Sequence, residues 1–476
     1  MPFSTIIMGM ATSILSLQDF LSRDSNGLSH STFSCPYCGK THQVPIGEMR
    51  VGYLVEEIPH ALERILQHPP RKAQILFDRA IEEVILEQVT RPLRQNGLNL
   101  SLLPAGEKGV LLDSETELGN RLALAVDDEA EILIGAGSGV ICDLTKWVAT
   151  RTQRPFLILG TAPSMNAFTS ITATMTENDV KTSVLLNPAD AVFLDVNIMV
   201  NAPMSMIHAG VGDLAARSIC NADWKLSHFI RGGYFCPLPY EMTTENERQV
   251  HASARGIAHR ETQAISFLGE AILKSGLSMT ILNGETSPSS GAEHVISHFW
   301  DLLTHTRHLP KNLHGTQVGV GTIIMLAFYE YMRKIDPGKI DPRQVIRRRP
   351  PVEDLLRENQ ARYGKAAPIF NEVVKTKYLT DDALADRIRW VQNHWEQLWN
   401  AVTPYAPSLE SIREPLHQAG MPMSLSAVHR SKEDAMEALI KGPQYRSRYT
   451  LLDLAWELGL FPEAAEAVLD LAGVLE

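Results

Sequence analysis

Short aliphatic runs alternate with longer helical patterns between residues 43 and 203. The clearest of these runs are AQILFD, EILIG, PFLILG and AVFLD. Runs of this kind predict strands, and strands that alternate with helices need crossover connections, which place them in a mostly parallel sheet with covered faces. The first half of the chain is therefore predicted to be an α/β domain.

The pattern changes near residue 204 to amphipathic helices with few strand signals, as in LLDLAWELGL and AAEAVLDLAGVL. Pro203 closes the last strand region, and MSMIHAGVGDLAAR then predicts a helix. We therefore expect a polar, Ser-rich lead at residues 1–33, an α/β domain at 34–203 and an all-α domain at 204–476.

Composition and charge narrow the class of protein. The 476 residues are 44% hydrophobic and 21% charged, as expected for a globular protein of about two domains. The net charge of −11 argues against a nucleic-acid or anionic-membrane surface, which needs a concentrated basic stripe. The dense basic run RQVIRRRPP is interpreted as a solvated helix end, stopped by Pro350 and Pro351.

The N-terminal segment and the cysteines bear on location. The first eighteen residues contain no Lys or Arg and no convincing cleavage site. No run approaches the roughly twenty apolar residues that would cross a bilayer. Five cysteines, an odd number, do not suggest a disulfide framework. These features predict a cytoplasmic protein with reduced thiols and no stable membrane insertion.

The segment CPYCGKTH contains Cys35, Cys38 and His42, a spacing that could begin a zinc ribbon or a redox site. No second CxxC is present, so a four-ligand site would have to borrow a distant cysteine: Cys142, Cys220 or Cys236. The sequence therefore favours a plain turn that enters the first strand.

One aspartate and several histidines suit a catalytic metal. His294 and His298 are four residues apart in SSGAEHVISHFW, so a helix would project both from one face. Asp213 in GVGDL and His314 in HGTQVGVGT would complete the site. Three protein ligands with an open position are typical of a catalytic zinc-type site. Alternatively, the two helical histidines are solvated or bonded to carbonyl groups.

A glycine-rich turn follows one predicted strand. The segment ILIGAGSGVICDLTKWVA places Gly135, Gly137, Ser138 and Gly139 between strand and helix, where free amides at a helix start favour phosphate oxygens. The spacing differs from GxGxxG, so a tight turn without a ligand is an equal alternative. Asp78, which ends AQILFD, is placed to accept from a ribose hydroxyl or adenine, or to cap a helix.

The next predicted strand ends in a polar loop. PFLILGTAPSMNAFTS offers hydroxyl and amide groups that suit a ligand loop, from Thr161, Ser164, Asn166 and Ser170. Any one of them could instead cap a helix. Because the glycine turn belongs to the first half and the metal candidates to the second, we expect cofactor and metal to meet in a cleft between the two.

Five ordered motifs carry a family resemblance: GAGSGVICDLTK, TAPSMNAFTS, HAGVGDL, SSGAEHVISHFW and HGTQVGVGT. Together with the closing RYTLLDLAWELGLF, they resemble the long bacterial branch of the sn-glycerol-1-phosphate dehydrogenases. These enzymes belong to the dehydroquinate synthase and iron-containing alcohol dehydrogenase superfamily. The resemblance implies a dehydroquinate synthase-like fold, with an α/β dinucleotide-binding domain, a helical metal- and substrate-binding domain, and one divalent metal, zinc or alternatively nickel or iron.

The same resemblance implies roles for individual residues. Asp213, His294 and His314 correspond to the metal ligands, and His298 corresponds to a substrate-contacting histidine that would relay a proton. The NAD(H) or NADP(H) contacts would come from residues in the two loops: Gly137, Ser138, Gly139, Asp143, Thr161, Ser164 and Ser170. Asp78 would repel a 2′-phosphate, which favours NAD.

One position departs from the family pattern. Asn166 stands where the family has an aspartate that contacts substrate, and it lacks the charge and the proton-accepting ability of aspartate.

We predict reduction of dihydroxyacetone phosphate to sn-glycerol 1-phosphate. A dehydroquinate-synthase-like cyclase and an NAD-binding regulatory relative with degenerate catalysis are the alternatives. Lys181 could contact the phosphate group of a small polyol phosphate substrate, or it could be a solvated surface residue. The protein is expected to form a homo-oligomer.

Overall fold

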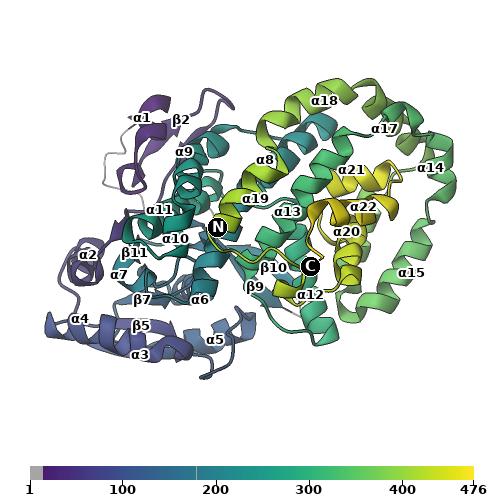
Figure 1. The fold of residues 1–476 in the computed structure, drawn as a ribbon. Coiled ribbons are helices and arrows are strands. Elements are labelled where there is room, and N and C mark those ends of the chain that lie inside the picture. The colour runs from purple at the N-terminus through teal and green to yellow at the C-terminus, as the bar shows by residue number, and fades with distance from the viewer. Residues whose placement is uncertain (1–13, 178–179, 476) are drawn as a thin grey trace.

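A computed structural model of the chain describes residues 14–177 and 180–475 (Figure 1). The strands are β1 Ile14–Leu15, β2 Thr32–Ser34, β3 Thr41–Gln43, β4 Glu48–Gly52, β5 Ala73–Asp78, β6 Leu100–Ala105, β7 Ile132–Gly137, β8 Phe156–Gly160, β9 Thr172–Glu177, β10 Val180–Leu185 and β11 Ala191–Asp195. The four aliphatic runs of the sequence correspond to β5, β7, β8 and β11, so those strand predictions are confirmed.

A six-stranded sheet forms the centre of the N-terminal half. Its strand order is β4-β11-β8-β7-β5-β6, and every neighbouring pair is parallel. The predicted parallel α/β architecture is therefore confirmed. β5 lies between β6 and β7, so the direction in which successive strands are added reverses there. Ligands of such sheets bind beyond the carboxyl ends of the strands at this kind of reversal, and the glycine turn follows β7.

Both faces of the sheet are buried. Successive side chains of a strand alternate between the two faces. In β5, Ile75 and Phe77 belong to a core under one face, whereas Leu76 belongs to the large core that continues into the helical half. This burial on both sides explains why the strands are continuous aliphatic runs in the sequence.

Helices surround the sheet and build the rest of the molecule. Those of the N-terminal half are α1 Leu17–Ser22, α2 Ile58–Leu66, α3 Glu82–Val84, α4 Arg91–Gln95, α5 Thr116–Leu124, α6 Gly139–Thr152 and α7 Val196–Met199. Those that follow are α8 Met204–Arg231, α9 Leu238–Ala252, α10 Ala254–Ala258, α11 Thr262–Thr280, α12 Ala292–Arg307, α13 His314–Arg333, α14 Pro342–Arg348, α15 Val352–Tyr363, α16 Ala367–Lys377, α17 Asp381–Asn393, α18 Trp395–Val402, α19 Leu409–Gln418, α20 Lys432–Tyr445, α21 Leu451–Glu457 and α22 Glu463–Ala472.

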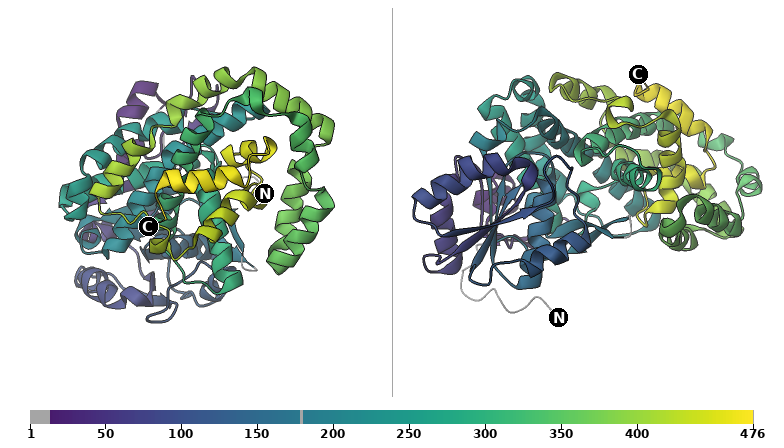
Figure 2. Two further views of the ribbon diagram at one scale, coloured as in Figure 1. Left: turned by 45° about the vertical axis from the view of Figure 1, so that its right-hand side comes forward. Right: turned by 90° about the horizontal axis from the view of Figure 1, so that it is seen from below.

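The second half is helical throughout its described residues, as predicted. Helices α8 and α13 pack against each other at its centre, and α12 packs against both. Figures 1 and 2 show the sheet on one side of the molecule and the C-terminal helices α20 to α22 on the other. The division at residues 33/34 and 203/204 stays a prediction; the last strand of the sheet ends at Asp195 and α8 begins at Met204.

Two smaller sheets lie outside the central one. β9 and β10 form an antiparallel pair, and β1, β2 and β3 form a three-stranded sheet in which β2 pairs with β1 in parallel and with β3 antiparallel. The segment CPYCGKTH is therefore the turn of the β2–β3 hairpin together with part of β3, and does not lead directly into the main sheet.

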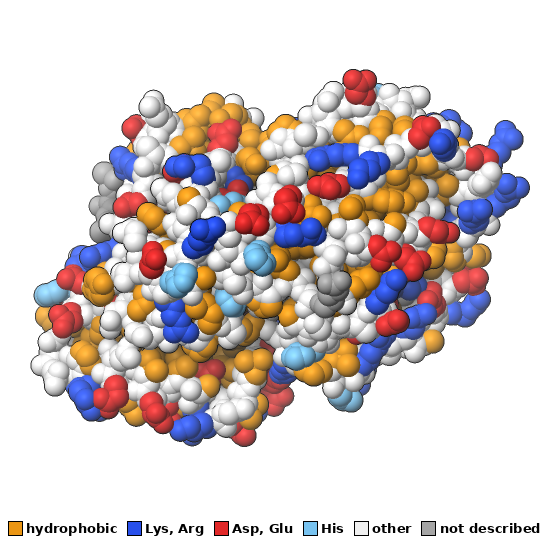
Figure 3. Space-filling model, in the orientation of Figure 1, with side chains coloured by type: hydrophobic (Ala, Val, Ile, Leu, Met, Phe, Trp, Pro, Cys, Tyr) orange, Lys and Arg blue, Asp and Glu red, His pale blue; other side chains and the backbone are white. Residues whose placement is uncertain are grey.

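The surface mixes charges of both signs. In the view of Figure 3, acidic and basic side chains are interspersed over the whole face, with hydrophobic side chains between them. Helix α14 ends at Arg348 within the basic run, and Arg349 then leads into Pro350 and Pro351, so the predicted helix end is confirmed. Among the described helices, none is long and apolar enough to cross a membrane.

Candidate active site

Three side chains from three central helices converge on one point. Asp213 comes from α8, His294 from α12 and His314 from the first position of α13. One ligand atom of each lies within 4.8 Å of the corresponding atoms of the other two, and all three side chains are mostly buried. The structure thus brings together the three residues that the sequence indicated as metal ligands.

The Asp213 carboxylate fits a metal ligand in the way its two oxygens are used. Oδ2 accepts a hydrogen bond of 2.9 Å from the backbone N–H of Asn166. Oδ1 is buried and has no hydrogen-bond partner in the described part of the chain, and it lies 3.6 Å from His294 Nε2 and 3.9 Å from His314 Nε2. A buried carboxylate oxygen without a partner is costly unless a cation or donor satisfies it. Its surroundings therefore suit a divalent ion.

The neighbouring residue Glu293 orients His294. Its Oε1 lies 2.7 Å from His294 Nδ1 and also accepts the N–H of Gly291 at 2.7 Å. A histidine that donates Nδ1–H to a carboxylate presents Nε2 as its ligand atom. Burial lowers the pKa of His294, but Asp213 and Glu293 outweigh this effect and raise that pKa to about 9. Without a cation, a proton on His294 would balance the two carboxylates.

We expect the Glu293→Gln variant to bind the catalytic metal roughly 10–100-fold more weakly, the usual cost of losing a carboxylate behind a histidine ligand. The amide keeps the shape of the side chain but removes the charge that holds the Nδ1 proton. Metal titration of the apoprotein measures the change. Glu285→Gln is a matched control, because that carboxylate caps Ser287 on the preceding turn. Equal affinities in both variants would contradict the role of Glu293.

Close backbone approach brings His314 to Asp213. A Cβ atom at Gly212 would overlap the carbonyl oxygen of Gly315, and a Cβ at Gly315 would overlap the carbonyl oxygen of Ala209. Glycine therefore lets α13 begin directly against α8. Burial lowers the pKa of His314 to about 4, and His294 adds to the effect, so His314 is neutral with a lone pair to donate.

The ring of His298 lies next to the two histidines among the candidate ligands. Its ring centre is 5.4 Å from that of His314 and 6.1 Å from that of His294. The Nδ1 atom is buried and has no hydrogen-bond partner among the described residues. Burial, reinforced by Arg446 and the other two histidines, holds the pKa of His298 well below its usual value. It is thus a neutral imidazole with a polar atom left free.

The glycine turn faces the same space from the sheet side. Helix α6 begins at Gly139, and the Ser138 side chain makes no capping bond to the first turn. A Cβ at Gly139 would overlap the Met165 side chain, which would have to shift to make room for it. The first amides of a fourteen-residue helix therefore point outward without a side-chain cap, which suits an anionic group.

An open pocket of about 690 Å³ extends from the turn to His314. Its wall includes Ser138 and Gly139 of the glycine turn, Ser164 and Met165 of the next loop, and His314. Lys181 of β10 also lines it, and its Nζ lies 3.0 Å from Asp301 Oδ2. The solvated-surface interpretation of Lys181 is therefore wrong. Burial opposes its charge, but Asp301 more than compensates and raises the pKa of Lys181.

The remaining cofactor candidates lie around the turn and mostly satisfy one another. Asp143 is buried and accepts the N–H of Thr174, and Lys146 lies 3.6 Å from its other oxygen. Burial raises the pKa of Asp143 to about 6. The Ser170 hydroxyl bonds to Thr172, and the N–H of Thr161 donates to the carbonyl of Gly137. Asp78 is the last residue of β5, and its carboxylate accepts the N–H of Ala80 at 2.9 Å. The nucleotide contacts of all these residues stay predictions.

Two contributions to the site were not found in the sequence. Glu293 directly precedes His294 in GAEH, and an acidic residue beside a candidate ligand is a signal that could have pointed to it. Asp301, one turn after His298 on α12, fixes Lys181 and also accepts from Gln317 at 2.8 Å. No local pattern links residue 301 to residue 181, so only the fold shows this pair.

Comparison with known proteins identifies the family. The family model described as iron-containing alcohol dehydrogenase matches residues 55–203. The glycerol-1-phosphate dehydrogenase (NAD(P)+) of Halalkalibacterium halodurans is 32% identical over 306 residues, which are 63% of this chain and 75% of that protein. The chain belongs to the glycerol-1-phosphate dehydrogenase family. The family's member from Geobacillus stearothermophilus is 31% identical over 302 residues, 62% of this chain and 72% of that protein.

Solved structures share the fold of this glycerol-1-phosphate dehydrogenase family member. A probable glycerol dehydrogenase from Sinorhizobium meliloti superposes with a TM-score of 0.57 at 16% identity, over 89% of this chain and 96% of that one. Glycerol dehydrogenase from Schizosaccharomyces pombe gives a TM-score of 0.55 at 15% identity, over 90% and 92%. The family is one of oxidoreductases within the iron-containing alcohol dehydrogenase superfamily, as the sequence motifs predicted.

Proposed function

We propose that this protein reduces dihydroxyacetone phosphate to sn-glycerol 1-phosphate with NADH or NADPH. The observation that carries the proposal is one pocket lined both by the uncapped start of α6 and by His314 of the three-ligand cluster. The relatives named glycerol-1-phosphate dehydrogenase (NAD(P)+) supply the reaction type.

Asp213, His294 and His314 would hold a divalent ion, which when bound polarises a carbonyl or alcohol oxygen as a Lewis acid. The protein's own part is to fix these ligands before substrate arrives. Asn166 N–H holds Asp213 through Oδ2 and leaves Oδ1 free, and Glu293 holds the ring of His294. Ser297 Oγ lies 3.3 Å from His314 Nδ1 and steadies the third ligand. Each ligand therefore keeps one atom directed at the shared point.

The pocket supplies binding groups for the two substrates. The dinucleotide is the hydride donor. Its pyrophosphate would bind to the first backbone amides of α6, together with Ser138 and Gly139. Lys181 lines the same pocket with a positive charge anchored by Asp301, and it would meet the substrate phosphate. Arg446 donates to the Lys181 carbonyl at 2.9 Å and adds positive charge nearby.

His298 would relay a proton from water to the reduced oxygen: one nitrogen of its neutral imidazole would take up a proton as the other releases its own, so the ring stays neutral. Asn166 cannot share this task. Its side-chain amide donates to Ser275 Oγ at 3.1 Å, and its backbone serves Asp213. Replacement of the family's aspartate by Asn166 thus leaves one imidazole as the proton-carrying group beside the three ligands.

The metal-reconstituted full-length protein should oxidise NADH or NADPH when dihydroxyacetone phosphate is added, and chiral analysis should identify the product as sn-glycerol 1-phosphate. One nucleotide should be consumed for each product molecule. A protein with metal and nucleotide bound that consumes none would contradict the proposal. Formation of the sn-3 isomer would contradict the assigned stereochemistry.

A further inference from the structure

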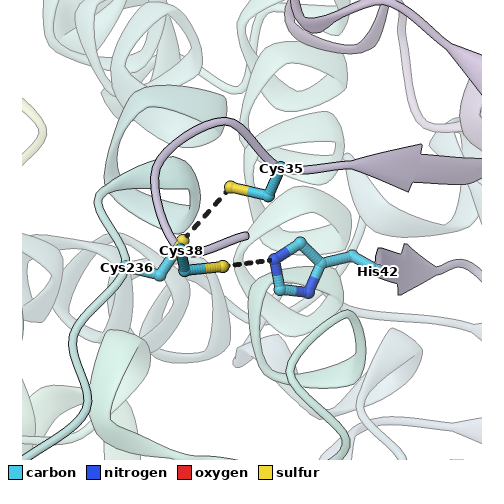
Figure 4. A group of neighbouring side chains, drawn as sticks. All are labelled: Cys35, Cys38, His42 and Cys236. Carbon is cyan, nitrogen blue, oxygen red and sulfur yellow. Dashed lines mark hydrogen bonds between the residues drawn. The ribbon is translucent and has the colours of Figure 1, made fainter. Parts of the chain in front are cut away.

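A second group of side chains that could hold a metal ion shares no residue with the candidate active site. Cys35 follows β2, Cys38 lies in the hairpin turn and His42 is the central residue of β3. Cys236 comes from the segment that joins α8 to α9. Figure 4 shows the three sulfur atoms and the His42 ring directed toward one another, and one ligand atom of each lies within 4.8 Å of the others.

The hairpin turn holds two of the cysteines in a fixed arrangement. Cys35 N–H donates to the carbonyl of Lys40 at 2.9 Å, and Gly39 N–H donates to the carbonyl of Cys35 at 3.0 Å. Gly39 has φ of +69°, a conformation that favours glycine. The turn therefore places both thiols of the CxxC pair on the side that faces Cys236.

His42 is oriented like a metal-binding histidine. Its Nδ1 lies 2.8 Å from the carbonyl oxygen of Ile281, so Nδ1 carries the proton and Nε2 carries the lone pair. Nε2 lies 3.3 Å from the sulfur of Cys38. His42 is the buried residue in a strand whose two neighbours are exposed, so the hairpin directs this ring inward.

The distances match a shared ion better than a covalent bond. The sulfur atoms of Cys35 and Cys236 are 3.6 Å apart, whereas a disulfide requires about 2.05 Å. Ligands at zinc-bond lengths in a tetrahedron are separated by about 3.8 Å for two sulfurs and about 3.6 Å for sulfur and nitrogen. All five cysteines are free in the structure.

We propose that Cys35, Cys38, His42 and Cys236 bind one structural Zn²⁺ ion. Three thiolates and one imidazole form a complete tetrahedral set, which is typical of closed structural zinc sites and leaves no position for substrate. Soft thiolate ligands favour zinc over magnesium or calcium. On binding, the ion gains three Zn–S bonds and one Zn–N bond, and the three thiol protons pass to solvent. Cys236 is thus the distant cysteine that a four-ligand site at CPYCGKTH requires.

Such an ion would fasten the N-terminal three-stranded sheet to the helical half. Cys35 and Cys236 are 201 positions apart, so the cross-link closes a very long loop. Other contacts around the cluster join the same two parts of the chain. Tyr37 Oη donates to Glu241 of α9 at 2.5 Å, and Lys40 Nζ lies 3.7 Å from the ring centre of Tyr234. The site would stabilise the fold without taking part in hydride transfer.

Metal analysis of full-length variants tests this assignment. The wild-type protein, saturated with zinc and passed over a desalting column, should retain two zinc ions per chain by mass spectrometry of the elements. Cys236→Ser should retain one and melt at a lower temperature, while His314→Ala should lose the other ion. Cys220→Ser is the matched control, because Cys220 is also buried but lies outside the cluster; it should retain both ions.

Ligand spectroscopy keeps the test decisive if Cys236→Ser fails to fold. His314→Ala should hold zinc at the cysteine cluster alone, and X-ray absorption should then show three sulfur neighbours and one nitrogen. Cobalt in that variant should give the strong visible bands and near-ultraviolet charge-transfer absorption of tetrahedral thiolate coordination. A zinc ion with only nitrogen and oxygen neighbours, no retained ion in His314→Ala, or a Cys35–Cys236 disulfide in the purified protein would each overturn the proposal.

Discussion

Replacing His314 by alanine is expected to abolish both binding of the catalytic metal and reductase turnover. His314 supplies one of three ligand atoms that lie within 4.8 Å of one another, and the alanine side chain offers none. A bound ion of this kind contributes several kcal/mol to stabilising the charge on the reacting oxygen. Because each 1.36 kcal/mol is a factor of ten in rate, kcat should fall by roughly 1,000-fold or more.

The measurement combines metal content, steady-state NADH oxidation and circular dichroism of the same preparation. His417→Ala is a suitable control, because His417 is an exposed residue of α19, and its metal content and kcat should match those of the wild type. Turnover of the folded His314→Ala protein at the wild-type rate would refute the proposed role of this cluster.

Replacing Lys377 by methionine is expected to lower the free energy of unfolding by about 3–5 kcal/mol, the cost of removing one partner of a buried ion pair. Lys377 Nζ lies 2.5 Å from Asp453 Oδ1 and also donates to the carbonyls of Pro443 and Arg448. Asp453 is buried, and its carboxylate accepts the backbone N–H of Thr450, the N-cap residue of α21. The variant would leave an uncompensated carboxylate between α16 and α21.

Chemical denaturation followed by far-ultraviolet circular dichroism measures this loss. Lys375→Met changes the same residue type on the same helix at an exposed position, so its unfolding free energy should stay within about 0.5 kcal/mol of the wild type. If both variants unfold at the same denaturant concentration, the buried pair does not contribute as described.

Local patterns were sufficient for much of the architecture. The four aliphatic runs are strands because both of their faces are buried, and a run of this type needs no information from distant residues to be recognised. The helix that carries Asp213 and the helix that carries both His294 and His298 were also predicted. The spacing of four residues was enough to place the two histidines on one face.

The order of the five motifs indicated the family, which the comparisons support, but not how each side chain is held. Asn166 shows the difference. The resemblance implied a substrate contact at this position, which stays a prediction, and the structure adds that the backbone N–H binds Asp213 and the side-chain amide binds Ser275. The partners in these two hydrogen bonds are separated by 47 and by 109 positions in the sequence. Such bonds depend on how the loop packs against α8 and α11, which the local sequence pattern does not specify.

The sequence by itself determined the α/β and helical halves, the glycine turn and the set of candidate metal ligands, because periodicity and residue type express local geometry directly. Only the tertiary structure decided that Glu293 orients His294, that Lys181 pairs with Asp301 and that Cys236 meets Cys35, Cys38 and His42. These contacts arise where separate elements pack together. Their partners are therefore fixed by the close approach of helices and loops and not by spacing along the chain.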